Sequence, residues 1–223
     1  MNKKISVIIR ARNEDRWIGH AMQSVLDFLE KPEIIIIDNK STDDTISIAR
    51  SFQTDPELES KGSFTDIKIV DIEEYTPGKA LNLGVKHASF DYILVLSSHC
   101  VITEFNLEKH VKDLNSNVAV FGNQIPKYNG KTITKRYLWS HFKEEEEKNM
   151  FSDMEKRYFF HNALSFFKKE FLIDNPFNEN LTGKEDRYWA NEIINSNHNI
   201  LYDPSMCADH HYTPNGNTWK GIG

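Results

Sequence analysis

The chain has 223 residues, enough for one large domain or two small ones with a substantial core. Aromatic residues make up 12% of it, which favours a packed globule over a disordered chain although 27% of the residues are charged. The formal net charge is −6 and the basic residues are scattered, which argues against nucleic-acid binding.

The first hundred residues alternate between short apolar runs and segments with helical spacing. Apolar runs predict strands at 5–9, 34–37, 67–72 and 92–96. Between them we expect a helix capped by Asn13 and closed by Pro32, another capped by Ser41 and reaching about Gln53, and a third over 79–88. Strands and helices that alternate at this spacing predict βαβ units and a mainly parallel sheet.

The second half of the chain has a looser pattern. We expect helices over 104–114 and 183–195, strands over 118–121, 163–167 and 200–202, and a long amphipathic helix over 135–150. A polar, histidine-rich tail follows. We expect the chain to form a single domain with two lobes, about 1–102 and 103–223.

The sequence gives little indication of a membrane span, a secretion signal or a disulfide. No run of about 20 apolar residues occurs, and the segment before Arg10 is too short for a signal peptide, so any membrane contact would be peripheral. Cys100 and Cys207 form no metal knuckle or disulfide framework, which favours reduced thiols in a cytoplasmic setting and leaves a disulfide open. The chain ends at 218–223 without a closing helix, so it can be part of a longer protein.

Polar side chains follow three of the predicted strands. They form the segments Arg10–Glu14, Asp38–Ser41 and Ser97–His99. Since ligands of open parallel sheets bind beyond the carboxyl ends of the strands, we expect a base, a ribose and a pyrophosphate there. Asp38 can accept from a base imide or a ribose hydroxyl, or Asp38 and Ser41 can simply cap a helix.

The missing glycine motifs narrow the class of ligand. No G-x-G-x-x-G follows the first strand and no G-x-x-x-x-G-K-[ST] occurs, which argues against a dinucleotide oxidoreductase and a phosphate-loop nucleotidase. A sugar nucleotidyltransferase, a more distant alternative, would need a glycine-rich loop where this chain has Arg10 and Arg12.

Three segments together resemble family-two glycosyltransferases. They are Ser6–Glu14, the turn Asp38-Asn39-Lys40-Ser41-Thr42-Asp43-Asp44-Thr45 after the second strand, and Gly78-Lys79-Ala80-Leu81-Asn82-Leu83-Gly84. The resemblance covers about 5–102, and 160–211 more weakly. It implies the GT-A fold, with a Rossmann-like, mainly parallel sheet flanked by helices, and sugar transfer with inversion from a nucleotide-sugar.

By the same resemblance, Arg12, Glu14 and Asp38 would line the base and ribose, and Lys79 would approach the diphosphate. The full set expected to bind the nucleotide-sugar is Arg10, Arg12, Asn13, Glu14, Asp38, Asn39, Ser41, Lys79, Ser97 and Ser98. A UDP-sugar is the default donor, with dTDP-, GDP- and CMP-sugars left open. The acceptor would be a glycan or lipid-linked hydroxyl in surface polysaccharide synthesis. The expected location is the cytoplasm, with the inner face of the membrane left open.

The chain departs from the family at the Asp-x-Asp motif, where it has Ser97-Ser98-His99. Hard cations prefer oxygen ligands, whereas an imidazole suits Mn²⁺ or a softer ion. Three interpretations stay open: a divalent cation (Mn²⁺ or Mg²⁺) bound around His99, a metal-independent enzyme, and an inactive nucleotide-sugar-binding relative. His210 and His211 are further candidate ligands, and adjacent residues in an extended segment point apart, so one of them would face the site.

The segment Gly183–Trp189 resembles the family's acidic pair before a helix. Inverting transfer needs a general base that takes the acceptor proton, and Asp186 matches that position. Glu185 would orient the acceptor or support Asp186, although acidic residues at a helix start also suit the helix dipole. An acceptor groove could include Arg136, Tyr137, Trp139, His141, His161 and Asn162, most of which also fit simple packing.

Overall fold

The computed structural model describes residues 3–53, 66–216 and 219, and a single large sheet dominates them. The strands in its main path are, in spatial order, β3 (Asp66–Asp71), β2 (Glu33–Asp38), β1 (Ile5–Ala11), β4 (Tyr92–Ser97), β11 (Leu164–Lys168), β6 (Ala119–Tyr128), β12 (Ile200–His211) and β5 (Cys100–Glu104). Two short strands, β7 (Lys131–Thr132) and β8 (Glu147–Lys148), pair with β6 and β12. A separate hairpin joins β9 (Phe151–Ser152) and β10 (Arg157–Tyr158).

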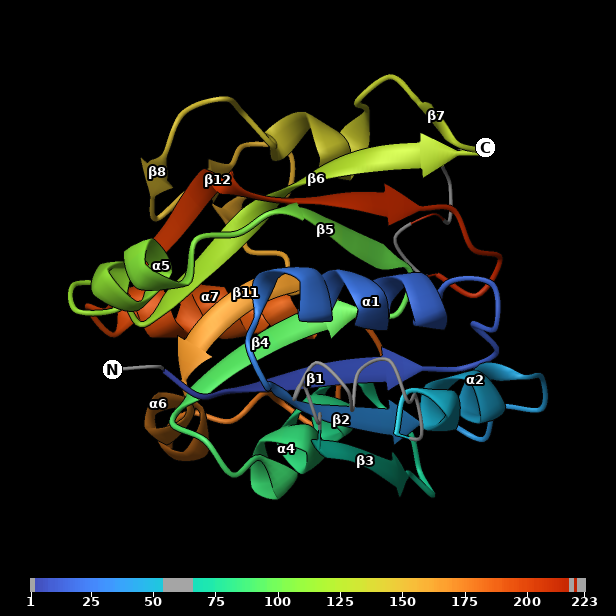
Figure 1. The fold of residues 1–223 in the computed structure, drawn as a ribbon. Coiled ribbons are helices and arrows are strands. Elements are labelled where there is room, and N and C mark those ends of the chain that lie inside the picture. Colours follow the sequence, from blue (N-terminus) through green and yellow to red (C-terminus); the bar gives the residue numbers. More distant parts are fainter. Residues whose placement is uncertain (1–2, 54–65, 217–218, 220–223) are drawn as a thin grey trace.

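The first four strands form the predicted parallel part of the sheet. β1 pairs in parallel with β2 and β4, and β2 pairs in parallel with β3. The arrowheads of these strands point to the same edge (Figure 1). The sheet then becomes mixed, because β11 runs antiparallel to both β4 and β6. The register pairs Ala11 with Asp38 and Arg10 with Ser97, so the predicted ligand-binding segments start from one edge.

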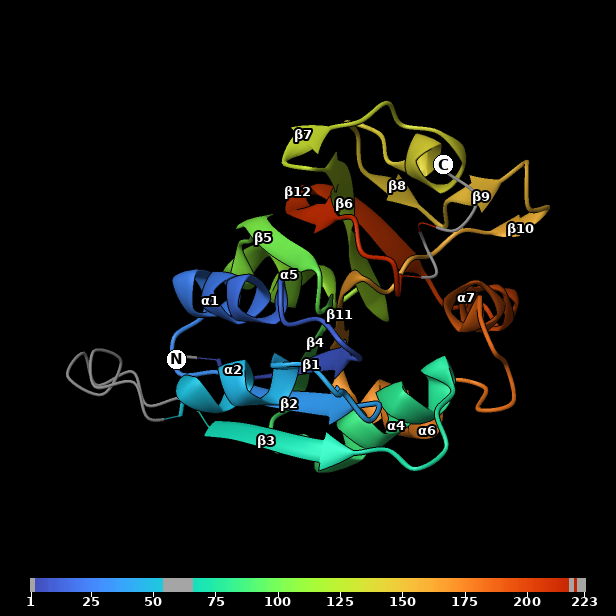
Figure 2. The same cartoon turned by 90° about the vertical axis from the view of Figure 1, so that its right-hand side faces the viewer.

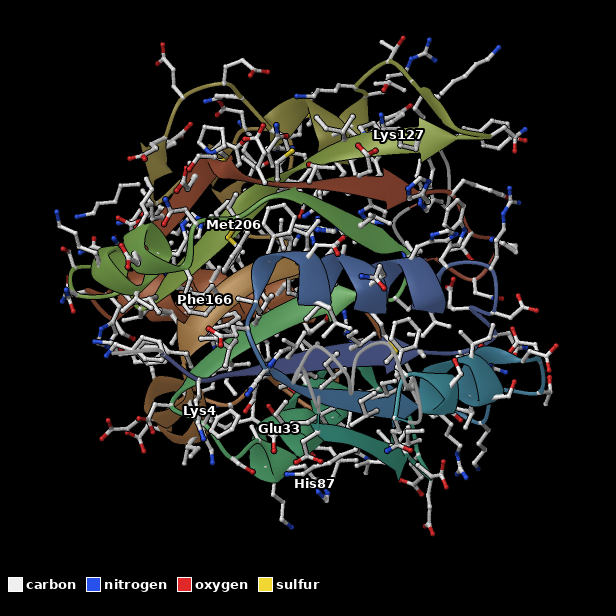
Figure 3. All side chains as sticks on the ribbon, in the orientation of Figure 1. Lys4, Glu33, His87, Lys127, Phe166 and Met206 are labelled. Carbon is white, nitrogen blue, oxygen red and sulfur yellow. The ribbon has the colours of Figure 1, made fainter. Side chains whose placement is uncertain are left out.

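Helices cover both faces of the sheet (Figure 2). One layer contains α1 (Ile18–Phe28), α2 (Thr45–Ser51) and α5 (Leu107–Asp113), and the other contains α4 (Pro77–His87), α6 (Lys169–Asp174) and α7 (Glu185–Asn195). Each layer closes over its own apolar core. Phe166 and Met206, labelled in Figure 3, belong to the core beneath α1. Strands buried on both faces explain the continuous apolar runs of the sequence.

The predicted starts of the first two helices are wrong. α1 begins at Ile18, after a turn in which the Glu14 carbonyl accepts from the Trp17 and Ile18 amides. Asn13 has a left-handed φ of 52° and lies before that turn, so it is not the cap. α2 begins at Thr45, whose amide and hydroxyl donate to Asp43 Oδ1. The cap expected at Ser41 is therefore absent.

The predicted helix over 135–150 is also wrong. This segment contains only a 3₁₀ turn, η1 (Tyr137–His141), followed by irregular chain and β8. Left-handed φ values of 48° at Tyr137 and 54° at Asn149 interrupt a helix. Tertiary partners satisfy the backbone instead, since Lys135 donates to the Phe142 carbonyl and the Tyr202 hydroxyl donates to that of Lys143.

β12 is longer than predicted, and β5 is an element that the prediction missed. We expected a strand over 200–202 and a loose tail, whereas β12 continues to His211 through an irregularity between Asp203 and Cys207. The helix expected at 104–114 begins later, at Leu107, because 100–104 form β5. Cys100 and Cys207 are free thiols. The expected lack of a helix over 218–223 concerns residues outside the described ranges, Trp219 excepted.

The described part of the chain contains no helix long and apolar enough to cross a bilayer.

Candidate functional site

A cavity of about 880 Å³ opens at the edge of the sheet to which β1 and β4 run. Its wall combines the segments after these two strands, the start of α7 and the tail after β12. The predicted site residues that line it are Arg10, Arg12, Asn13, Glu14, Asn39, Ser97, Ser98, His99, Glu185 and Asp186. One cavity therefore joins the residues predicted for the nucleotide-sugar to the residue predicted as the base.

Asp38 and Ser41 are not in the cavity wall. Asp38 is 3% exposed, and it accepts hydrogen bonds from the Ser41 hydroxyl (2.6 Å) and amide (3.0 Å). Ser41 Oγ in turn accepts from the Asn13 amide at 3.0 Å, while Asn13 Oδ1 accepts from the Thr42 amide at 2.7 Å. These two residues brace the loops after β1 and β2 against each other and leave Asn39 facing the cavity.

Lys79 is also outside the cavity wall, because its ammonium pairs with Glu74 at 3.0 Å. The remainder of the motif around it serves packing. Asn82 donates to the Phe177 carbonyl (2.9 Å) and accepts from the Phe177 amide (3.0 Å). A Cβ at Gly78 would lie 2.4 Å from the Asn178 carbonyl oxygen, and one at Gly84 would lie 2.5 Å from Ile8.

His99 and His210 meet beside the cavity. Their Nε2 atoms are 3.0 Å apart, although they lie 111 residues apart in the chain. The other nitrogen of each ring faces an oxygen: His99 Nδ1 is 3.4 Å from Glu14 Oε1, and His210 Nδ1 is 2.9 Å from Gln124 Oε1. Burial, with His99 adding to it, holds the pKa of His210 well below its usual range, so this imidazole is neutral.

His211 points away from that pair, as the alternation along an extended strand requires. Its ring stacks on Trp17 with the centroids 3.9 Å apart, and its amide donates to the His99 carbonyl. The geometry therefore favours His210 over His211 as the partner of His99.

Arg10 and Asn162 hold Glu185 at the start of α7. The Arg10 guanidinium and the Asn162 side-chain amide each donate to Glu185 Oε1 at 3.0 Å. Asp186, the next residue, accepts from the Arg187 guanidinium at 2.6 Å and from the Asn162 backbone amide at 3.3 Å. Burial alone would raise the pKa of Asp186, but Arg187 and His161 outweigh it and keep that pKa below its usual range.

The acceptor residues named from the sequence separate into three groups. Tyr137, His161 and Asn162 line the cavity, and Tyr137 is 66% exposed. Trp139 and His141 are buried in packing contacts, where His141 stacks on Phe159 with the centroids 4.0 Å apart. Arg136 is exposed and outside the cavity wall.

The sequence-based prediction did not name several residues of the cavity wall, which are Tyr75, Pro77, Leu138, Glu155, Pro214, Asn215 and Gly216. Asn215 donates to the Asn13 carbonyl at 3.0 Å and so ties the tail to the loop after β1. Nothing in the sequence around these residues distinguishes them from ordinary loop positions. Arg187 could have been suspected, because it adjoins the predicted base.

Among the described residues, one group of three metal-type ligands lies close together, formed by His110, Asp113 and Asp203. Lys109 already places its ammonium 2.6 Å from Asp203 and 3.0 Å from Asp113. The group is outside the cavity wall. It is best described as an ion-pair network that joins α5 to β12.

Known proteins resemble this chain in both sequence and fold. Residues 6–175 match the family described as Glycosyl transferase family 2. The GalNAc(5)-diNAcBac-PP-undecaprenol beta-1,3-glucosyltransferase of Campylobacter jejuni is 28% identical over 193 residues, which cover 84% of this chain and 59% of that protein. A Methanococcus voltae dolichyl N-acetyl-alpha-D-glucosaminyl phosphate 3-beta-D-2,3-diacetamido-2,3-dideoxy-beta-D-glucuronosyltransferase is 31% identical over 111 residues, 48% of this chain and 33% of that protein.

Among solved structures, Staphylococcus aureus TarS 1–349 in complex with UDP-GlcNAc superimposes with a TM-score of 0.69 at 20% identity, covering 98% of this chain and 61% of that one. The chain therefore spans about 60% or less of the length of these relatives. Its fold is that of the GT-A glycosyltransferases, as predicted. The chain belongs to glycosyl transferase family 2.

Proposed function

We propose that this chain transfers a sugar, with inversion, from a nucleotide-sugar to a hydroxyl of a glycan or lipid-linked acceptor. The observation that carries the proposal is that Arg12, Asn39 and Asp186 all line one cavity. A volume of about 880 Å³ is within the usual range for a small-molecule site. The base and ribose would lie on the loops after β1 and β2, and the acceptor would approach Asp186.

Asp186 is the proposed general base. It is 3% exposed, so the developing proton transfer takes place away from bulk water. The acceptor hydroxyl would give its proton to a carboxylate oxygen of Asp186 as its own oxygen attacks the anomeric carbon and the bond to the diphosphate breaks. Glu185 is engaged by Arg10 and Asn162, which suits a role in positioning rather than in proton transfer.

The residues around His99 fit a divalent cation. His210 Nδ1 faces Gln124 Oε1, which directs the Nε2 lone pair of His210 at His99, while Glu14 Oε1 lies 3.4 Å from His99 Nδ1. The two Nε2 atoms are within hydrogen-bond distance at 3.0 Å, and two nitrogen ligands of one ion, each about 2.1 Å from it, lie roughly this far apart. We propose that His99 and His210 hold a divalent cation, whose charge would stabilise the leaving diphosphate.

The relatives support the class of substrate but leave the particular sugar open. The name of the Campylobacter jejuni protein describes glucosyl transfer to an undecaprenol-linked glycan, and the Staphylococcus aureus structure holds UDP-GlcNAc. A UDP-sugar donor and a lipid-linked glycan acceptor are therefore the first pair to assay. A role in surface polysaccharide synthesis is part of the same proposal.

Replacing the base tests the mechanism. Asp186→Asn should lower kcat about 10²-fold to 10⁴-fold, because an amide cannot take the acceptor proton, while the Kd for the donor changes only slightly. Donor affinity is measured by calorimetry with UDP and UDP-sugars, and turnover by UDP release in the presence of acceptor. Asp174→Asn, an exposed position on α6, is the matched control and should transfer at the wild-type rate.

The same assay separates transfer from binding alone. Wild-type protein that binds nucleotide-sugars and releases no UDP with any acceptor would favour the inactive binding domain. An Asp186→Asn variant with wild-type turnover would remove Asp186 as the base and leave the remainder of the proposal standing.

A further inference from the structure

A chain of buried polar side chains links the proposed cation ligands to the acceptor end of the cavity. From His210 Nδ1 it continues to Gln124 Oε1 at 2.9 Å, and from Gln124 Nε2 to His161 Nδ1 at 2.8 Å. Gln124 and His210 are 0% exposed and His161 is 5% exposed. Trp139 packs edge-on against His210 with the centroids 4.8 Å apart, which helps to exclude water from the chain.

Gln124 fixes the tautomers of both imidazoles, because one end of its amide only accepts hydrogen bonds and the other only donates them. A donor faces the amide oxygen, so His210 carries its proton on Nδ1. The amide nitrogen donates to His161, so His161 has its lone pair on Nδ1 and its proton on Nε2. The orientation of Gln124 thereby couples two histidines whose ring centroids are 6.0 Å apart.

The direction of this chain rests on the proposed function. A cation on His210 Nε2 requires the proton on Nδ1, and that proton requires the oxygen end of Gln124. The opposite orientation would protonate His210 on Nε2 and exclude it as a ligand. Only one orientation of Gln124 is therefore compatible with a cation, and it exposes an Nε2 proton on His161.

His161 lines the same cavity as the segment Ser97–His99 and Asp186. Its Nδ1 is turned to Gln124, so Nε2 is the nitrogen available to a ligand. Burial, followed by the charge of Arg187, lowers the pKa of His161 to about 3, so the ring stays neutral and acts as a hydrogen-bond donor at neutral pH.

We propose that Gln124 is a positioning residue that sets His161 as a fixed Nε2–H donor to an oxygen of the transferring sugar. Neither residue takes the acceptor proton. Through Gln124, the same hydrogen-bond chain that prepares His210 for the cation also prepares His161 for the sugar. Binding at the diphosphate end and recognition at the sugar end are then coupled.

Gln124→Glu tests the coupling, because a carboxylate accepts from both rings. His210 keeps an acceptor for its Nδ1 proton, so Mn²⁺ affinity should stay within a few-fold of wild type. His161 instead places a proton on Nδ1 and turns a lone pair toward the sugar. We expect kcat/KM for UDP-sugars to fall about 10-fold to 100-fold. The small change in Mn²⁺ affinity should account for little of this fall. Gln23→Glu, at an exposed position of α1, is the matched control.

The tautomer itself is measured by nitrogen-15 NMR of histidine-labelled protein, without any turnover. Wild-type His161 should show a protonated Nε2 and an unprotonated Nδ1, and Gln124→Glu should reverse this. Should that variant fold poorly, His161→Gln and His161→Asn give a second comparison. The glutamine amide can replace an Nε2 donor and the shorter asparagine amide cannot, so His161→Gln should retain more activity.

A wild-type His161 protonated on Nδ1 overturns the inference, whatever the transfer assay shows. So does wild-type kcat/KM in Gln124→Glu, or equal activity in the two His161 variants. Wild-type protein that neither binds Mn²⁺ nor transfers sugar would contradict the proposed function, and the NMR result would still decide the tautomer of His161.

Discussion

Asp186 is held by the residue that follows it in the chain. The Arg187 guanidinium lies 2.6 Å from Asp186 Oδ2 and 5.0 Å from the centre of the Phe159 ring, and both are buried. Burial alone would raise the pKa of Asp186, yet the neighbouring positive charge keeps it low. A low pKa makes a carboxylate a poor proton acceptor, so Arg187 sets the reactivity of the proposed base.

Removing that charge should change the pH dependence of transfer. As the proposed base, Asp186 would act in its ionised form, so activity should be lost as the pH falls through its pKa. In Arg187→Gln the burial effect is no longer opposed by Arg187, and the acidic limb of kcat/KM should move to higher pH by about one unit or more. Arg157→Gln is the control. It removes a cation–π contact with Tyr188 and should leave the acidic limb at its wild-type position. An unmoved limb in Arg187→Gln would show that Asp186 does not control it.

At the scale of single residues, the sequence named many residues that line the cavity but did not separate them from residues that brace the loops. We expected Asp38 either to contact the nucleotide or to have a structural role as a helix cap. Its carboxylate accepts hydrogen bonds from Ser41, which is a structural role, although not that of a helix cap. Gln124 has no local signal at all. Its partners are 37 and 86 residues away, so its role becomes visible only once β6, β11 and β12 are assembled.

At the scale of elements, β12 decides which histidine meets His99. Its pairing with β6 shifts between Asp203 and Cys207, so three residues, 204–206, have no partner in the register. Since a slip of one residue turns every following side chain to the other face, this bulge sets the side on which His210 emerges. The predicted strand stopped at Tyr202 because Pro204 and polar residues follow it.

Gly122 on β6 lies against the irregular part of β12 and has no space for a side chain. A Cβ there would lie 2.3 Å from the Met206 carbonyl oxygen and 2.7 Å from a Leu164 methyl group. Because the nearest atom is backbone, Gly122→Ala should lower the free energy of unfolding by about 1–3 kcal/mol or more. Thermal or urea unfolding measures it. Gly183→Ala, where a Cβ meets nothing within 4 Å, should have little effect, and equal stability of the two variants would refute the argument.

Elements of the first half were easier to predict than those of the second. Strands β1, β2 and β4 are apolar runs buried on both faces, and the burial leaves a strong local signal. The segment 135–150 has helical spacing of apolar residues, yet Trp139, Phe142 and Met150 enter the core from irregular chain. Side chains satisfy part of this backbone, since Lys135 donates to the Phe142 carbonyl and the distant Tyr202 donates to the Lys143 carbonyl, which no helical pattern reports.

At the scale of the whole molecule, the sheet order explains why one cavity can hold both ends of the reaction. β1 and β4 are neighbours and deliver Arg10 and Ser97 side by side, while β11, antiparallel to β4, starts at the same edge and places Asn162 beside them. α7 begins there with Glu185 and Asp186. The tail after β12 closes the wall through Pro214, Asn215 and Gly216. Ligands at this edge therefore contact segments from both halves of the chain, and their binding should stabilise the folded chain.

That linkage gives a test of the cation site. At 100 times its Kd, a ligand that binds only the folded state stabilises it by about 2.7 kcal/mol, which for a chain of this size raises Tm by roughly 5–10 °C. Mn²⁺ with UDP should produce such a shift in wild type, and chelation should reduce it. His99→Ala and His210→Ala should lose the part that depends on Mn²⁺. His211→Ala, which loses only the stacking on Trp17, should keep it. A full shift in His99→Ala, or an equal loss in His211→Ala, would contradict a cation held by His99 and His210.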